Sequence, residues 1–176
     1  MKTKKIKQTI KEYFFTNPNA KLRVREIERK LKLPLPSVIR YCKELKKESI
    51  LDITKIGNVT FYTANKSGEE YMLEKKLYNI KKLYDSGTID YLKEEWSNPT
   101  IIVFGSFANG QDIEESDIDL YIETPSNKKV NLDKFKNILN REIQIFKHRS
   151  IKEIKNSDLA NNIINGVLLN GYLEVL

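Results

Sequence analysis

The sequence predicts an α+β protein of two domains, in which helices and a β-hairpin precede a small α/β domain with a mixed sheet. The apolar spacing changes from helical to a strand pattern near residue 50, and a dense apolar strand pattern appears at residues 100–104. The net charge is +11 over residues 1–66, but −2 over residues 67–98 and −2 over residues 99–176. A chain of 176 residues is long enough for two small domains.

Three short helices are expected in the first domain. Apolar residues recur at helical spacing over residues 4–15 and 24–31, and a polar run at residues 16–19 ends the first helix. A third helix is expected over residues 36–48, because Pro36 suits a first helical turn. Its buried side would be formed by Val38, Ile39, Tyr41, Cys42 and Leu45.

A β-hairpin is expected after these helices. Residues 50–56 and 59–63 have the pattern of strands, and Gly57 and Asn58 would form the turn between them. Three helices followed by a hairpin is the element order of a winged helix-turn-helix. Residues 1–66 resemble that fold.

The resemblance implies that the third helix enters the major groove of DNA and that the hairpin reaches a neighbouring backbone. The positive charge of residues 1–66 is typical of a nucleic-acid binder. The alternative is a dimerisation or protein-docking domain with a solvated lysine-rich surface. The expected DNA contacts are Ser37, Arg40, Lys43, Lys46 and Lys47 on the third helix and Lys55 on the hairpin.

Residues 67–98 are expected to link the two domains through helices. Apolar residues recur at three- and four-residue steps over residues 67–84, and Ser67 with Glu70 fits a capping box. A short helix is expected over residues 88–96. The longer helix would either pair two copies into a homodimer or pack on its own domain, and the sequence leaves both open.

The second domain, residues 99–176, alternates strand and helix patterns. Its strands are expected at residues 100–104, 118–122 and 142–146. Its helical segments are expected just after Gly105 and Ser106, at residues 132–139 and at residues 159–169. This order predicts an α/β domain with a small mixed sheet.

One ordered motif carries the chemistry of this domain. The apolar strand at residues 100–104 runs into Gly105 and Ser106, and ten residues later Asp117 and Asp119 flank a single isoleucine. Strand, spacing and flanking residues resemble the signature of the minimal nucleotidyltransferases of the DNA polymerase β superfamily. The resemblance implies transfer of a nucleoside monophosphate from an NTP, with ATP expected, to a hydroxyl.

The residue types in this motif also fit that chemistry on physical grounds. Glycine after a strand allows a sharp turn, and Ser106 at the start of a helix offers its hydroxyl and its N–H group to an anion. Asp117 and Asp119 are two positions apart on a strand, so both point to one face. Two adjacent carboxylates repel each other unless a cation neutralises them.

The cation is expected to be Mg²⁺ or Mn²⁺. The chain has one cysteine and one histidine, which makes neither a disulfide within the chain nor a Cys/His zinc site. Oxygen ligands remain, and Mg²⁺ typically binds one or two carboxylates together with substrate phosphates. The absence of a Walker A lysine motif argues against a P-loop NTPase.

One position departs from the resemblance. Active members of the superfamily carry a third carboxylate on a later strand, on the face of the aspartate pair. In this sequence Gln144 occupies the position where that acid is expected. Glu142 shares its face and is the expected substitute, and Asp133 is a more distant one. Nucleotide and metal binding are therefore implied more firmly than turnover.

Two functions remain open at this point. The first is an antitoxin-like, Mg²⁺-dependent nucleotidyltransferase that binds DNA and modifies a hydroxyl of a protein toxin or another acceptor. The second is a DNA-binding transcriptional regulator whose nucleotidyltransferase domain senses a nucleotide or docks a partner. The basic N-terminus lacks the apolar segment of a signal peptide, and no apolar run is long enough for a membrane span. A cytoplasmic protein that does not enter the membrane is therefore expected.

Overall fold

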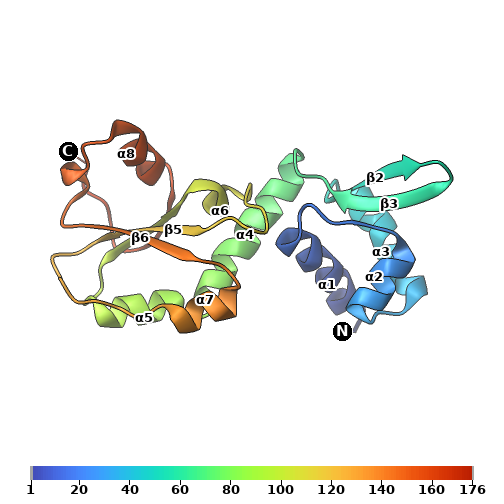
Figure 1. Cartoon of the computed structure of the whole chain (residues 1–176), viewed down its shortest axis with the longest axis horizontal. Helices are drawn as coiled ribbons and strands as arrows, with labels where there is room; N and C mark the ends of the chain where they lie inside the picture. Colours follow the sequence, from blue (N-terminus) through green and yellow to red (C-terminus); the bar gives the residue numbers. More distant parts are fainter. Residues whose placement is uncertain (1, 176) are drawn as a thin grey trace. The chain divides into compact units, whose positions relative to one another are not determined.

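The structure, a computed structural model, describes residues 2–175, and it describes side chains from residue 5 onward (Figure 1). The chain divides into two compact units, Met1–Tyr78 and Asn79–Leu176. The boundary falls inside one helix, α4 (Glu69–Asp85), so residues expected to form a linker contribute to both units.

The N-terminal unit contains three helices and a small sheet. The helices are α1 (Lys2–Thr16), α2 (Val24–Leu31) and α3 (Leu35–Lys47). The strands β2 (Leu51–Ile56) and β3 (Val59–Ala64) form the expected antiparallel hairpin, in which Ile56 lies opposite Val59. A third strand that the sequence pattern did not reveal, β1 (Lys21–Leu22), pairs with β3 and gives the sheet order β1-β3-β2.

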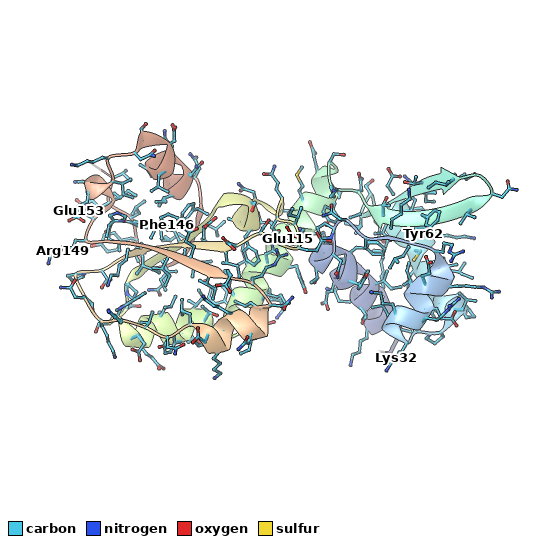
Figure 2. All side chains as sticks on the ribbon, in the orientation of Figure 1. Lys32, Tyr62, Glu115, Phe146, Arg149 and Glu153 are labelled. Atoms are coloured by element: carbon cyan, nitrogen blue, oxygen red, sulfur yellow. The ribbon has the colours of Figure 1, made fainter. Side chains whose placement is uncertain are left out.

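The core of this unit lies between α1, α3 and the sheet. Ile10 and Phe14 of α1 are fully buried with Leu45 of α3, and Tyr62 of β3, labelled in Figure 2, is also buried. Cys42 is buried, and this burial raises the pKa of its thiol to about 12, which is typical of an unreactive core cysteine. The prediction that Ile39 faces the core is wrong, because its side chain is 36% exposed while its neighbours fill the interior.

The C-terminal unit is built on a four-stranded mixed sheet with the order β6-β5-β4-β7. Its strands are β4 (Thr100–Phe104), β5 (Ile118–Glu123), β6 (Ile143–His148) and β7 (Val167–Asn170). Only β5 and β6 run parallel, because α7 carries the chain back between them. The helical segments besides the end of α4 are α5 (Thr88–Glu95), α6 (Gly105–Asn109), α7 (Asp133–Leu139), the 3₁₀ turn Ile151–Glu153 and α8 (Ser157–Ile164).

The last expected helix is shorter than predicted. It ends at Ile164, and residues 167–170 form the edge strand β7, which pairs with β4. Gly166 lets the chain pass close to β4 between the helix and the strand, because a Cβ atom at this position would lie 2.6 Å from the carbonyl oxygen of Val103. The apolar run after it could fit either a helix or a strand, and pairing with the open edge of β4 decided in favour of the strand.

Two apolar layers sandwich the sheet. On one face, Val103 and Leu120 pack with Leu92 of α5 and Phe135 of α7. On the other face, Phe104 packs in a cluster with residues of α8 and the 3₁₀ turn, so the helices cover the sheet from both sides (Figure 1). Register partners share a face, which places Phe104, Asp119 and Gln144 side by side on the α8 face.

Among the described residues, no helix has both the length and the apolar character that a membrane crossing requires.

Candidate functional site

The turn after β4 brings a glycine against a carboxylate. Gly105 has φ of +72°, a conformation that side-chain-bearing residues rarely adopt. A Cβ atom at Gly105 would also lie 2.8 Å from Oδ2 of Asp119, which is adjacent because Asp119 pairs with Phe104 across the ladder. The backbone conformation therefore favours glycine here, and a side chain at this position would also displace the carboxylate of Asp119. Ser106, the second residue of the turn, is partly exposed.

Asp117 and Asp119 lie at the start of β5. Asp117 immediately precedes the strand and is exposed, whereas Asp119 is partly buried within it. Burial raises the pKa of the Asp119 carboxyl above its ordinary value, and the negative charge of Asp117 raises it further. The pair is thus close enough for its charges to repel.

This donor set fits a hard divalent cation that also binds phosphate oxygens. Among the described residues, no group of three or more His, Cys, Asp or Glu side chains is arranged to hold a metal ion. Two carboxylates suffice for Mg²⁺ when a substrate supplies phosphate oxygens, but they would not make a cage formed by protein alone. Because burial and the charge of Asp117 raise the pKa of Asp119, a bound cation beside the pair would be electrostatically favourable.

The position beside Asp119 on the neighbouring strand is occupied by Gln144. The two residues are register partners in the parallel pair β5–β6, and Gln144 is exposed. Glu142 lies just before β6 and accepts a hydrogen bond from the N–H of Ile118 through its carbonyl oxygen. Its carboxylate is 68% exposed and pairs with Lys136 at 2.5 Å. Asp133 is the first residue of α7 and is exposed.

A buried ion pair fixes the loop that leads to Asp117. Nη2 of Arg141 lies 3.0 Å from Oδ2 of Asp112, and the two side chains are 8% and 1% exposed. Nη1 of Arg141 donates to the carbonyl oxygens of Ser116 and Ile113. The side chain of Asn79 in α4 donates to Oδ1 of Asp112 at 2.8 Å.

This ion pair ties together both segments that border the acid pair. The loop between α6 and β5, where Figure 2 labels Glu115, ends at Asp117. Arg141 is followed directly by Glu142 and the strand that carries Gln144. The roles of Arg141, Asp112 and Asn79 could not be predicted from the sequence, since an arginine before a strand and an acid in an acidic loop give no distinguishing signal.

The residues expected to contact DNA lie in the N-terminal unit. Arg40, Lys43, Lys46 and Lys47 are exposed on α3 and Lys55 is exposed on β2, whereas Ser37 is partly exposed. Arg40 lies over the ring of Tyr41, and Lys46 pairs with Asp52 at 2.6 Å. Lys43 and Lys47 form no ion pair with any described residue. These positions are accessible, and DNA contact stays a prediction.

Comparison with known proteins agrees with the geometry of the C-terminal unit. Residues 86–165 match the family model described as a nucleotidyltransferase domain. The match supports the nucleotidyltransferase domain predicted from the sequence. The matched segment contains the Gly105 turn, the acid pair and the ion pair between Arg141 and Asp112. A search of curated proteins found no match.

Replacing Asp119 with the neutral isostere should stabilise the ligand-free protein. Asp119→Asn is expected to raise the melting temperature at pH 7 by about 1–3 °C. A carboxyl whose pKa is higher in the folded than in the unfolded state destabilises the fold as pH rises through that interval. Thermal unfolding between pH 3 and pH 8 should therefore show the gain vanishing toward the acid end, where both states are protonated.

Glu115→Gln, which removes an exposed charge from the preceding loop, is the matched control and should change the melting temperature little. A lower melting temperature of Asp119→Asn at neutral pH would show that the Asp119 carboxylate is held by favourable contacts.

Breaking the buried ion pair should destabilise the C-terminal unit strongly. Arg141→Ala is expected to lower its free energy of unfolding by about 3 kcal/mol, because Asp112 would remain buried without its cation. Urea unfolding followed by fluorescence of Trp96, the single tryptophan of the chain, reports on this unit.

The double variant Arg141→Met/Asp112→Leu should lose less than the sum of the two single changes, because neither charge is left unpaired. Arg149→Ala removes an exposed arginine of the same unit and should shift stability by less than about 0.5 kcal/mol. An equal effect of Arg141→Ala and Arg149→Ala would contradict a structural role for the pair.

Proposed function

We propose that the C-terminal unit is an Mg²⁺-dependent nucleotidyltransferase that moves a nucleoside monophosphate from an NTP, with ATP as the expected donor, to a hydroxyl. The observation that carries the proposal is the contact of Asp119 with the Gly105 turn, beside Asp117, within a segment that matches a nucleotidyltransferase domain. Mn²⁺ is the alternative cation, because it accepts the same oxygen ligands.

Each residue of the site has a role in this proposal. Gly105 lets the triphosphate approach the backbone, and the hydroxyl and N–H groups of Ser106 donate hydrogen bonds to it. Because α6 has only five residues, these local donors matter more than a helix dipole. Asp117 and Asp119 would hold the metal, which neutralises charge on the phosphates and helps pyrophosphate leave.

Gln144, at the position where a third carboxylate was expected, limits the activity of the site. Gln144 is neutral, so it can orient an acceptor hydroxyl through hydrogen bonds but cannot accept its proton as a carboxylate does. Glu142 lies next to this position, but its carboxylate is engaged by Lys136. Turnover therefore depends on Glu142 leaving that ion pair or on a proton acceptor from solvent.

A second candidate function rests on the N-terminal unit. A winged helix that binds DNA is supported by the three helices, the hairpin and the charge of +11 over residues 1–66. With Gln144 in the third position, the protein would then act as a transcriptional regulator whose C-terminal unit senses a nucleotide or docks a partner.

An antitoxin that binds its own promoter and modifies a protein toxin would combine both functions. A homodimer would suit this role, and Leu73 and Leu77 of α4 offer an exposed apolar face, 53% and 57% exposed. Half-sites on DNA would then follow the symmetry of the pair.

Calorimetric titration of Mg²⁺ and ATP, followed by a pyrophosphate assay, separates an enzyme from a sensor. Wild type is expected to bind Mg²⁺–ATP, and Asp117→Asn/Asp119→Asn is expected to weaken this binding at least about tenfold. Gln144→Glu should raise the rate of pyrophosphate release, because it restores a carboxylate at the third position.

Glu115→Gln is again the matched control, since it removes charge from the same region without touching the pair. Binding of ATP without pyrophosphate release from either wild type or Gln144→Glu would favour the sensor. Unchanged ATP affinity in the double aspartate variant would exclude the acid pair as the nucleotide site.

The DNA-binding function has its own test. Lys43→Ala/Lys47→Ala should weaken binding to duplex DNA and reduce the slope of log affinity against log salt by about 2, one for each lost phosphate contact. Lys134→Ala/Lys155→Ala removes the same charge from the C-terminal unit and should leave the slope unchanged. Equal losses in both variants would point to bulk charge rather than to α3.

A further inference from the structure

A buried amide on α4 bonds to both segments that would form the nucleotide site. Asn79 is 3% exposed, and its side chain donates to the carbonyl oxygen of Phe107 at 2.9 Å and to Oδ1 of Asp112 at 2.8 Å. Phe107 belongs to α6, which begins at the Gly105 turn, and Asp112 lies in the loop that ends at Asp117. One side chain therefore connects the turn that would hold phosphate with the loop that leads to the acid pair.

The short helix α6 depends on its surroundings for its position. With five residues it is far below the length at which an isolated helix is stable. Phe107 and Ala108 are buried, and the carbonyl oxygen of Ser106 accepts a hydrogen bond from the N–H of Gln111 at 2.9 Å. The hydrogen bond from Asn79 adds a partner on α4, a helix of 17 residues. The place of the Gly105 turn is thus set partly by α4.

The connection at Asp112 is separate from the buried ion pair. Arg141 pairs with Oδ2 of Asp112, whereas Asn79 donates to Oδ1. An asparagine side chain has two N–H donors, and the two bonds of Asn79 use both of them. Loss of this amide would leave Arg141 paired with Asp112 and would remove the link between Asp112 and α6.

We infer that Asn79 is a positioning residue of the nucleotide site, and this inference rests on the function proposed above. Its amide holds the Gly105 turn in register with the acid pair, so that one Mg²⁺–triphosphate group contacts both. A ligand that spans two segments binds more tightly when their relative position is fixed beforehand. Asn79 acts through α6 and the loop before Asp117, and it lies outside residues 86–165, the segment that matches the nucleotidyltransferase family.

Calorimetric titration of Mg²⁺–ATP into full-length variants tests this role. Asn79→Ala removes both donors and is expected to weaken binding about tenfold, because the turn must then be ordered when the ligand binds. Asn170→Ala is the matched control. The side chain of Asn170 also donates twice, to Oδ1 of Asn98 and to the carbonyl oxygen of Pro99, at the opposite end of β4 from Gly105. This control should keep the affinity of wild type.

A double-variant comparison distinguishes positioning from a general structural role. In the Asp117→Asn/Asp119→Asn background, Asn79→Ala should cost little further affinity, because the turn and the acid pair no longer bind one ligand together. Equal losses in the two backgrounds would show that Asn79 does not link the turn to the pair, and would overturn the inference.

Hydrogen–deuterium exchange of the ligand-free protein provides a second readout. In Asn79→Ala the amides of residues 105–117 should exchange faster, whereas those of β5 and β6 should keep their wild-type rates. Asn79→Leu keeps the branched shape of the side chain without its donors and should show the same local change. Uniformly faster exchange in both variants would assign Asn79 to the stability of the unit alone and overturn the inference.

The titration separates failure of this inference from failure of the proposed function. Wild-type affinity in Asn79→Ala and Asn79→Leu, or an equal loss in Asn170→Ala, would overturn the inference and leave the proposed function intact. Absence of Mg²⁺–ATP binding by wild type would overturn the proposed function, and the inference with it.

Discussion

The buried ion pair between Arg141 and Asp112 is the constraint on which the acid site depends. It joins the loop before β5 to the residue before β6, so both strands that carry site residues start from one fixed point. Burying two charges is costly, but hydrogen bonds from Asn79 to Asp112 and from Arg141 to the carbonyl oxygens of Ile113 and Ser116 offset much of that penalty. The same network connects α4 to the site.

In contrast to this stabilising ion pair, the two adjacent carboxylates of Asp117 and Asp119 repel each other when no cation is bound. Asp119 lies against the Gly105 turn and close to the charge of Asp117. Among the described residues, no positively charged side chain forms an ion pair with either carboxylate. Residues held in such an arrangement reduce stability in the absence of a ligand and gain from a bound cation. Lys136 forms its ion pair with Glu142 and interacts with Asp117 only at longer range.

The sequence predicted most elements because their patterns were local. The helices α2 and α5, the hairpin and the strand before Gly105 needed only spacing and turn residues, and the Gly-Ser and Asp-x-Asp pattern located the Gly105 turn and the acid pair. The two-residue strand β1 and the edge strand β7 are defined by partners distant in sequence, so their own residues gave no signal. The Arg141–Asp112 pair also depends on a contact between distant segments, which no spacing rule describes.

Lys136 pairs with Glu142 and also interacts with the charge of Asp117. Its hydrogen bond to Glu142 raises its pKa, and the charges of Asp133 and Asp117 act in the same direction. An anion that competes with Glu142 for Lys136 would make the potential at Asp117 more negative and release Glu142. Binding of that anion would then strengthen the cation affinity of the acid pair, and thermodynamic reciprocity requires that the cation strengthen anion binding by the same factor. A single lysine would thus couple the anions around it to the affinity of the acid pair for a cation.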